Sequence, residues 1–207
     1  MKQKGVLIVV SGFSGAGKGT IVKRIVSESD QYALSISMTT REPRPGEVDG
    51  KDYFFVTKER FEEAISNGEL IEYANYVGNY YGTPRKYVDE RIEEGKDVIL
   101  EIEMQGAIQV KTRFPEAVLV FVTPPNASTL KERLLKRGTE TEEVVNKRMR
   151  RAYEESSFIG RYDYLLVNDD LDKCVKDLHI LIDASHHAPN CSAELLKKIN
   201  EELEEYK

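Results

Sequence analysis

The feature that constrains this chain most is a glycine-rich segment near its N-terminus, Gly12-Phe13-Ser14-Gly15-Ala16-Gly17-Lys18-Gly19-Thr20. A short β-branched apolar run precedes it in residues 5–11, and apolar residues recur at helical spacing in residues 21–26. A G-x-x-x-x-G-K sequence between a strand and a helix indicates a phosphate-binding loop rather than an ordinary turn. Its backbone N–H groups converge on an anion, to which the start of the helix adds partial positive charge. Lys18 would supply a point charge for the terminal phosphates of a nucleoside triphosphate.

One position departs from the usual form of this loop. The residue after the lysine, where Ser or Thr commonly binds magnesium, is Gly19, and a hydroxyl follows only at Thr20. We therefore expect no metal ion bound directly by protein side chains. Mg²⁺ would be held mainly through nucleotide phosphates and water, with Thr20 on a phosphate oxygen. The Gly-Lys-Gly-Thr form resembles the loop of nucleoside-monophosphate kinases.

Composition and charge narrow the class of protein. The 207 residues carry a net charge of −6, with 32% charged and 40% hydrophobic residues, which is typical of a globular chain with one good core. The acidic balance argues against a general nucleic-acid or membrane surface, so we expect neither a nucleic-acid polymer nor a membrane as partner. The apolar run in residues 6–10 is too short for a signal peptide core or a membrane span, which favours a cytoplasmic protein.

The cysteines and two adjacent histidines give weaker indications. Cys174 and Cys191 are too few to form a disulfide framework, so we expect reduced thiols. His186 and His187 are neighbours and would point in different directions on a helix. We expect both to be solvated, with metal binding as the alternative.

The order of the expected elements predicts the fold class. Buried strands are indicated over residues 98–103, 117–122 and 164–167, with helical segments between them. Such alternation predicts a doubly wound α/β fold, a P-loop NTPase core in which helices flank a parallel sheet. The last helical segment is amphipathic and includes Leu195 and Ile199.

Two insertions are expected to interrupt this core, over residues 37–87 and 128–151. The first is rich in strand and hairpin signals, and predicts a small mixed-β subdomain with a hairpin about Gly78-Asn79. The second predicts a helical hairpin that acts as a lid. Insertions over the carboxyl edge of a parallel sheet are where ligands are bound and lids close. We expect a single domain over residues 1–207, with its core in three pieces, residues 1–36, 88–127 and 152–207.

Local capping signals refine the first insertion. Thr57 is expected to cap a short helix that ends at Asn67-Gly68. Thr83 is expected to cap the following helix, with Pro84 at its first position and Gly95 at its end.

The second insertion is basic within an acidic chain. Eight cations stand against four glutamates there: Lys131, Arg133, Lys136, Arg137, Lys147, Arg148, Arg150 and Arg151 against Glu132, Glu140, Glu142 and Glu143. A basic helix face is usually only a solvated surface. In a chain with a triphosphate-binding loop, arginines that close over the transferring group would neutralise charge and exclude water.

These motifs together resemble the guanylate kinase family over nearly the whole chain. The resemblance rests on the loop and on seven further segments, residues 37–44, 46–53, 71–72, 78–83, 101–106, 137–141 and 168–170. It does not extend over about the last twenty residues. The family implies phosphoryl transfer from ATP to GMP (and to dGMP), with ATP as co-substrate and Mg²⁺ as cofactor.

The resemblance implies an acceptor site and a donor site. The residues implied for GMP are Ser37, Arg41, Arg44, Tyr53, Glu72, Tyr81, Thr83 and Glu103, and those for ATP are residues 12–20 and Asn168. Two guanidinium forks and two phenol hydroxyls suit a dianionic phosphate. Glu72 would accept from guanine N1–H and the 2-amino group, and adenine lacks the N1 donor. Glu103 stands where the family often has aspartate.

The reaction itself needs no protein base, because the second pKa of a phosphate monoester is about 6. The protein must instead align two polyanions that repel each other. The residues we expect to do so are Lys18, Arg41, Arg133, Arg137 and Arg148.

Two other functions stay open. Guanylate-kinase-like domains also serve as non-catalytic interaction scaffolds, but that reading expects a degraded loop and companion domains. A kinase of another monophosphate, AMP or dTMP, would share the core, although residues such as Arg41, Tyr53 and Glu72 argue against it.

The amphipathic final helix could pack on the core or form a homo-oligomer.

Overall fold

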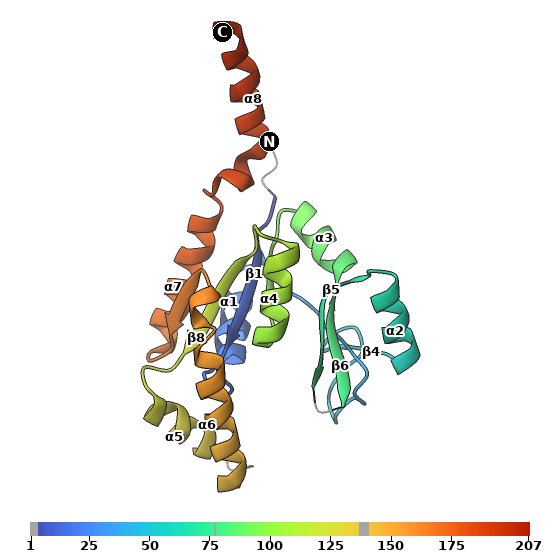
Figure 1. The fold of residues 1–207 in the computed structure, drawn as a ribbon, viewed down its shortest axis with the longest axis vertical. Coiled ribbons are helices and arrows are strands. Elements are labelled where there is room, and N and C mark those ends of the chain that lie inside the picture. Colours follow the sequence, from blue (N-terminus) through green and yellow to red (C-terminus); the bar gives the residue numbers. More distant parts are fainter. Residues whose placement is uncertain (1–3, 77, 137–140) are drawn as a thin grey trace.

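The computed structural model of the protein describes residues 4–76, 78–136 and 141–207, and it contains two β-sheets (Figure 1). The larger sheet is parallel, with the strand order β2-β7-β1-β8-β9. Its strands are β1 (Leu7–Gly12), β2 (Tyr32–Leu34), β7 (Asp97–Glu101), β8 (Val118–Thr123) and β9 (Tyr164–Val167). The α/β fold class predicted from the sequence is therefore confirmed.

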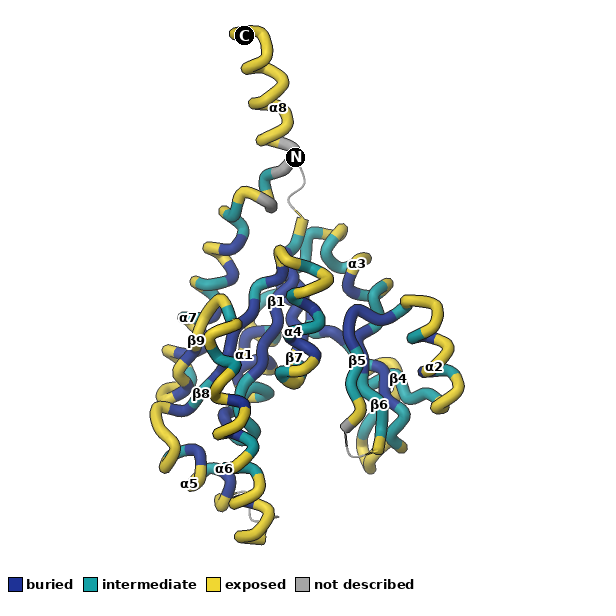
Figure 2. The backbone as a smooth tube through the Cα atoms, in the orientation of Figure 1, coloured by how far each residue is buried: buried dark blue, intermediate teal, exposed yellow. Residues whose placement is uncertain are grey.

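Strand β1 lies at the centre of the larger sheet and is buried on both faces. Alternate residues point to opposite faces of a strand, and each set joins a different apolar cluster. Ile8 and Val10 pack with helices α1 (Lys18–Glu28) and α7 (Leu171–Ser185). Leu7 and Val9 pack with helices α3 (Arg85–Glu93) and α4 (Met104–Arg113). Helices thus cover both faces of the sheet, as Figures 1 and 2 show.

The smaller sheet has the order β4-β3-β6-β5 and lies beside the core (Figure 1). It comprises β3 (Met38–Thr39), β4 (Phe54–Phe55), β5 (Leu70–Tyr76) and β6 (Asn79–Pro84), with helix α2 (Lys58–Ser66). The pair β3–β4 is parallel and the other pairs are antiparallel, so the predicted mixed-β insertion and its hairpin are present. Met38, Phe61 and Leu70 form its own apolar cluster.

The second insertion is helical, as predicted. Helix α5 (Ala127–Lys136) packs against helix α6 (Glu142–Ser156) through Leu130, Leu134 and Val145. Thr141 caps α6, because its side-chain oxygen accepts from the Val144 N–H. The predicted break at residues 138–139 lies outside the described residues.

The structure contains one of the two predicted helix caps and one strand that was not predicted. Thr57 caps α2, as predicted. Helix α3 starts at Arg85 with Pro84 as its N-cap residue, so the predicted cap at Thr83 was wrong. Thr83 belongs to β6, where its hydroxyl donates to Glu72 instead of to a helix terminus. Strand β2 was not predicted, because three residues are too short for a periodic signal.

The segment after β9 leads away from the core. Helix α7 is followed by short 3₁₀ turns at Pro189–Ser192 and Glu204–Tyr206, with helix α8 (Ala193–Leu203) between them. A further 3₁₀ turn, Ile159–Arg161, precedes β9. Helix α8 projects from the body of the molecule (Figure 1). In the described part of the chain, no helix is long and apolar enough to cross a membrane.

The histidine expectation was partly wrong. The side chain of His186 is only 15% exposed, and its Nε2 lies 2.9 Å from Oδ1 of the buried Asp97. That oxygen also accepts from the Val6 N–H, so the end of α7 is joined to the start of the sheet. His187 is exposed, and both cysteines are free thiols.

We predict that Phe61→Ala loosens the smaller sheet selectively. Phe61 is fully buried, and its ring stacks on Tyr80 at 5.2 Å between centroids. Removing a buried phenylalanine side chain costs about 3–5 kcal/mol. Phe61 belongs to the smaller sheet's apolar cluster, and only its neighbour Ile71 of β5 packs with the cluster of the larger sheet among the buried residues described for β5 and β6. Amide hydrogen exchange should therefore rise in β5 and β6 while β1, β7 and β8 keep their protection.

The matched control is Tyr153→Ala, since this side chain on α6 is 81% exposed and its loss should leave exchange unchanged in both sheets. An equal rise of exchange in both sheets of the Phe61 variant would mean that they unfold as one unit.

Candidate active site

The glycine-rich segment forms a loop between β1 and α1, which we call the phosphate loop (residues 12–20). Gly17 is the N-cap residue of α1 with φ of 94°, a conformation that side chains with a Cβ rarely adopt. The loop leaves backbone N–H groups at the helix N-terminus facing a hollow of about 390 Å³. Lys18 folds back over it, and its Nζ donates to the Gly12 carbonyl at 2.6 Å. This geometry suits the phosphates of a nucleotide.

Side chains from distant segments brace the phosphate loop. The buried Asn168 donates from Nδ2 to the Ala16 carbonyl at 2.8 Å. A Cβ at Gly17 would come within 2.4 Å of the same nitrogen, so only glycine leaves room for this amide. Arg133 of α5 donates to the Asn168 carbonyl at 2.9 Å, and Arg148 of α6 donates to Ser14 Oγ. The loop is thereby connected to the helical hairpin.

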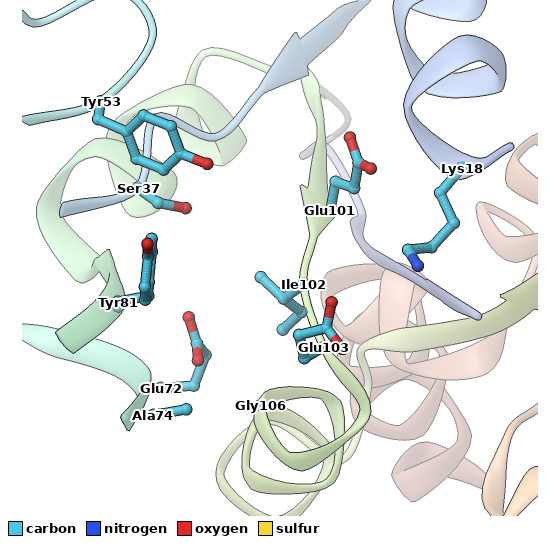
Figure 3. A pocket seen from close by; sticks show the side chains of 11 residues that line it. Lys18, Ser37, Tyr53, Glu72, Ala74, Tyr81, Glu101, Ile102, Glu103 and Gly106 are labelled. Carbon is cyan, nitrogen blue, oxygen red and sulfur yellow. The ribbon is translucent and has the colours of Figure 1, made fainter. Parts of the chain in front are cut away.

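A second cavity, of about 360 Å³, lies between the two sheets and reaches the phosphate loop. Figure 3 shows Ser37, Tyr53 and Tyr81 on one side, Glu101 at the end of β7 and Glu103 just after it in the middle, and Lys18 on the far side. Six of the residues predicted for the site line this cavity: Lys18, Ser37, Tyr53, Glu72, Tyr81 and Glu103. Lys18 and the Glu72 carboxylate therefore face the same cavity from opposite sides.

The Glu72 carboxylate is the most buried charged group of this cavity, at 4% exposure. Thr83 Oγ1 donates to its Oε1 at 2.6 Å. A Cβ at Gly106 of α4 would come within 2.6 Å of its Oε2, so a glycine is required for this close packing. Burial raises the pKa of Glu72 to about 6, although the Thr83 hydrogen bond opposes that rise. A carboxylate held this way can accept hydrogen bonds from a ligand in the cavity.

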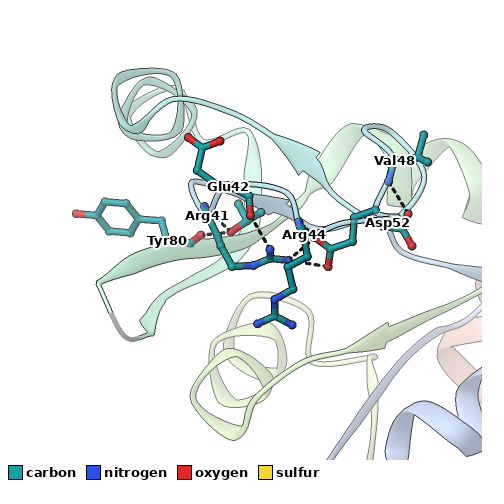
Figure 4. A network of polar contacts seen from close by, with 8 residues as sticks. Arg41, Glu42, Arg44, Val48, Asp52 and Tyr80 are labelled. Atoms are coloured by element: carbon teal, nitrogen blue, oxygen red, sulfur yellow. Dashed lines mark hydrogen bonds and ion pairs between the residues drawn. The ribbon is translucent and has the colours of Figure 1, made fainter.

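Arg41 and Arg44 differ in the contacts of their guanidinium groups (Figure 4). Arg41 Nη2 donates to both carboxylate oxygens of Glu47, at 2.9 and 3.0 Å, and its Nη1 donates to the Glu42 carbonyl. The Arg44 N–H donates to Glu47 at 2.7 Å, whereas its guanidinium points away from this ion pair. Arg41 also lies 5.4 Å from the centroid of the Tyr53 ring. Arg41 thus stands next to Tyr53 with its guanidinium already on the Glu47 carboxylate.

The remaining predicted residues lie at the margin of the two cavities. Thr83 is fully buried behind Glu72, and Asn168 is buried behind the phosphate loop. Arg133 and Arg148 contact the loop backbone or Ser14, as above, and Arg137 lies outside the described residues. No group of three or more His, Cys, Asp or Glu side chains is placed to hold a metal ion among the residues that the structure describes.

Comparison with known proteins assigns the family. The family model described as guanylate kinase matches residues 4–185 of this chain. The chain belongs to the guanylate kinase family. It is 54% identical over 187 residues to a guanylate kinase of Streptococcus thermophilus, an alignment that covers 90% of each chain. It is 50% identical over 202 residues to that of Oceanobacillus iheyensis, covering 98% of each.

The fold supports the same assignment. The crystal structure of guanylate kinase from Anaplasma phagocytophilum matches with a TM-score of 0.73 at 32% identity, covering 92% of this chain and 90% of that one. The resemblance predicted from the motifs is therefore confirmed.

The sequence did not indicate three residues that lie at or next to this site, namely Glu101, Glu47 and Arg151. Glu101, at the end of β7, lines both cavities. Desolvation raises the pKa of its carboxyl, while the positive charges of Lys18 and Lys23 oppose the rise. Its position at the carboxyl end of a central strand was the available signal. Glu47 is held by Arg41, and Arg151 of α6 lies 3.3 Å from Glu103. Neither contact has a sequence signature, because both depend on how the insertions fold.

We predict that the free energy of unfolding depends on pH through protonation of Glu72. The folded state raises the pKa of this carboxyl from 4.5 to about 6, so it binds the proton more tightly than the unfolded chain does. The free energy of unfolding contributed by this group therefore falls as pH rises between these values, by about 2 kcal/mol. Glu72→Gln removes the titration and keeps an oxygen for Thr83. The variant should be more stable than the wild type above this range, and the excess should vanish below it.

Urea unfolding of both proteins across this pH interval measures the difference. Glu154→Gln, at an exposed position on α6, should follow the wild type. A stability difference for Glu72→Gln that stays constant with pH would show that Glu72 does not titrate in this interval.

Proposed function

We propose that this protein transfers the γ-phosphoryl group of ATP to GMP, and to dGMP, giving ADP and GDP in purine nucleotide metabolism and GMP recycling. The observation that carries the proposal is the common cavity with Lys18 on one wall and the buried Glu72 on the other (Figure 3). Such a cavity suits two nucleotides that meet end to end, with the phosphate loop at the donor end.

Glu72 is proposed to read the guanine base. Its carboxylate would accept from N1–H and the 2-amino group, while Thr83 keeps the side chain in place through the 2.6 Å hydrogen bond. Adenine would leave this buried acceptor facing another acceptor, which costs roughly 10⁴-fold in selectivity where a site is built for the hydrogen bond. Ser37 and Glu103 lie on the same cavity and would take remaining polar atoms of the nucleoside.

The acceptor phosphate is proposed to bind between Tyr53, Tyr81, Arg41 and Arg44. The two tyrosine rings lie 6.2 Å apart between centroids, and burial raises the pKa of Tyr53, so its hydroxyl stays a donor at neutral pH. Two phenol donors and guanidinium groups suit a dianionic phosphate. Arg41 would have to share its fork between this phosphate and Glu47.

The donor is proposed to bind on the phosphate loop, with Lys18 on its terminal phosphates and Asn168 bracing the loop. Arg133, Arg148 and Arg137, which lies outside the described residues, would place further positive charge near the transferring group from the helical hairpin. Together with Lys18 and Arg41 they are the residues proposed to act in catalysis. Because the acceptor phosphate is largely ionised near neutral pH, their work is alignment and charge neutralisation rather than proton abstraction.

Mg²⁺ is proposed as cofactor, held mainly through nucleotide phosphates and water. The residues present fit such an ion. A Cβ at Gly19 would come 3.3 Å from Glu101 Oε1, so the glycine keeps space between the loop and this carboxylate. Glu101 would hold water molecules of the ion's hydration shell, and the Thr20 hydroxyl would contact a phosphate oxygen. When bound, the ion would neutralise charge on the phosphates.

We also propose a division of the chain into subdomains, a cellular location and a set of partners. We assign residues 37–87 to an acceptor-binding insertion and residues 128–151 to a lid, on a core of residues 1–36, 88–127 and 152–207. We place the protein in the cytoplasm, with nucleotides as its partners and neither a nucleic-acid polymer nor a membrane. Self-association is included because α8 carries exposed apolar side chains.

A coupled assay of ADP formation with GMP, dGMP, AMP, UMP and dTMP tests the reaction. Turnover with the guanine nucleotides alone is the expected result. Turnover with another monophosphate would instead support a different kinase on this core, and no turnover at all would support a binding module.

We predict that Lys18→Ala reduces turnover by roughly 10²–10³-fold, the usual effect of removing one group that stabilises transition-state charge. Affinity for GMP should change little, because Lys18 lies at the far side of the cavity from Glu72 (Figure 3). Single-turnover kinetics and calorimetric titration of GMP measure the two effects. The control is Lys176→Ala, which removes an exposed cation from α7, outside both cavities, and should keep the wild-type turnover. An equal loss of GMP binding in Lys18→Ala would contradict the division of roles.

We also predict that Glu72→Gln relaxes base selectivity. The glutamine amide can donate to adenine N1 and is a poorer acceptor for the guanine donors, so the ratio of kcat/KM for GMP over AMP should fall by at least an order of magnitude from its starting value of roughly 10⁴. Glu69→Gln, three residues earlier and outside the cavity, should keep the wild-type ratio. If Glu72→Gln discriminates against AMP as well as the wild type does, Glu72 does not read the base.

A further inference from the structure

Strand β5 is irregular at the place where it carries Glu72. Leu70 of β5 pairs with Pro84 of β6. Three residues later on β5, Tyr73 pairs with Gly82, which is only two residues away from Pro84. One extra residue therefore stands in β5 between these pairs, which makes a β-bulge. Bulges change the direction of side chains and occur often beside active sites.

The bulge decides which way two consecutive side chains point. Neighbouring residues of a regular strand face opposite sides of the sheet. Ile71 packs in the apolar cluster of the larger sheet, which includes Val110 of α4. The next residue, Glu72, faces the same helix, with its carboxylate against Gly106 (Figure 3). In a strand without the extra residue, only one of these two side chains would face α4. The bulge is therefore a condition for the position of the buried carboxylate.

Helix α4 binds the backbone of β5 on both sides of the bulge. On one side, Gln109 Nε2 donates to the Tyr73 carbonyl at 2.9 Å, and the Tyr73 N–H donates to Gln109 Oε1 at 3.4 Å. On the other side, Arg113 Nη1 donates to the Ile71 carbonyl at 2.7 Å and to the Leu70 carbonyl at 3.3 Å. Because β5 is the last strand in the order β4-β3-β6-β5, these side chains take the place of a further strand along its edge.

The residues of α4 that meet this part of β5 share one face of the helix. Gly106, Gln109 and Arg113 follow one another at intervals of three and four residues, the spacing of a single helical face. Arg113 also acts through its charge. Burial raises the pKa of Glu72, and both the Thr83 hydrogen bond and the Arg113 charge oppose that rise. The ionised carboxylate is the form that only accepts hydrogen bonds, as a reader of two N–H donors must.

We propose that Gln109 and Arg113 are positioning residues for base selectivity, because they hold the β5 bulge that directs the Glu72 carboxylate into the cavity. Neither side chain lines the cavity, so both act through Glu72 rather than by touching a nucleotide. This inference rests on the proposed reading of guanine by Glu72. The donor end should be unaffected, since the phosphate loop lies between β1 and α1.

The first experiment measures kcat/KM for GMP and for AMP in Gln109→Met combined with Arg113→Met. Methionine keeps an unbranched, helix-compatible side chain and removes the hydrogen bonds. The ratio of GMP over AMP should fall by roughly tenfold, because a displacement of ~1 Å at an active site can cost up to roughly 10²-fold. The KM for ATP should keep its wild-type value. A double variant with the wild-type ratio overturns the proposal.

Single variants grade the effect and carry the test if the double variant does not fold. Gln109→Met and Arg113→Met should each lower the ratio by less than the double variant does. Arg113→Lys keeps the charge and N–H donors, so its ratio should lie between those of the wild type and Arg113→Met. Single variants that all keep the wild-type ratio overturn the proposal as well.

The matched control is Lys111→Met on the same helix. Lys111 also donates to a backbone carbonyl, that of Ala117, and it pairs with Asp163, each at 2.8 Å. These partners adjoin the larger sheet, next to β8 and β9. The control should lose stability towards urea and keep the wild-type ratio. A fall of the ratio as large as that of the double variant would indicate general loosening of α4, and would overturn the proposal.

The second experiment separates this inference from the role of Glu72. In a Glu72→Gln background, adding Gln109→Met and Arg113→Met should leave the GMP-over-AMP ratio unchanged, because residues that act through one group are not additive. A further fall equal to that in the wild-type background overturns the proposal. If Glu72→Gln alone keeps the wild-type ratio, the proposed reading of the base fails, and this inference fails with it. If Glu72→Gln lowers the ratio and the double variant does not, only this inference fails.

Discussion

The buried carboxylate of Glu72 is the group on which the candidate site depends. Removing a carboxylate from water is costly unless hydrogen bonds compensate it, and here one oxygen receives a hydroxyl donor from Thr83. The other lies against Gly106, at a distance that a larger residue would not permit. The remaining cost is visible as the raised pKa of Glu72, about 6. Such an acceptor gains most from a ligand that brings two N–H donors, which links the packing of the smaller sheet to the selectivity we propose.

The Ala16 carbonyl is a second point on which several elements converge. It accepts from Asn168, which follows β9, at 2.8 Å, and from Arg133 of α5 at 3.4 Å. One backbone oxygen of the phosphate loop thus connects the edge of the larger sheet with the helical hairpin. Arg148 of α6 also reaches the loop at Ser14. Side chains of both hairpin helices thus hydrogen-bond to the phosphate loop or to the residue that braces it.

Much of this architecture could be predicted from the sequence, and the exceptions have physical causes. The phosphate loop, the strand β9 and the hairpin β5–β6 were predicted because their signals are local: glycine spacing, a short apolar run and a turn. Strand β2 was missed because its three residues form a strand only by pairing with β7. The cap expected at Thr83 failed because the buried Glu72 competes for the same hydroxyl, which is a tertiary effect.

The residues of the site were likewise predictable where the signal is local and not where it depends on tertiary packing. Motif resemblance proposed which residues belong to it, and six of them line one cavity. It could not indicate that Thr83 and Asn168 are buried supports rather than cavity walls, because burial depends on how the second sheet and β9 pack. Arg151 and Glu103 come together from positions 48 residues apart, and no pattern within either segment signals that contact.

The Arg41–Glu47 ion pair orders a side chain that we propose binds the acceptor phosphate. The Arg44 N–H and the Arg41 guanidinium hold the pKa of Glu47 below its usual value, so this carboxylate stays ionised at neutral pH. It keeps the Arg41 fork ordered next to Tyr53, where a flexible arginine would otherwise lose conformational entropy on binding. A phosphate that approaches this fork has to share it with a carboxylate that retains the Arg44 N–H as a second donor. Arg41 would then exchange part of one anionic partner for another, and its charge would stay neutralised throughout. Preorganisation of this kind lets the acceptor site stand ready without an unpaired cation in a partly buried position.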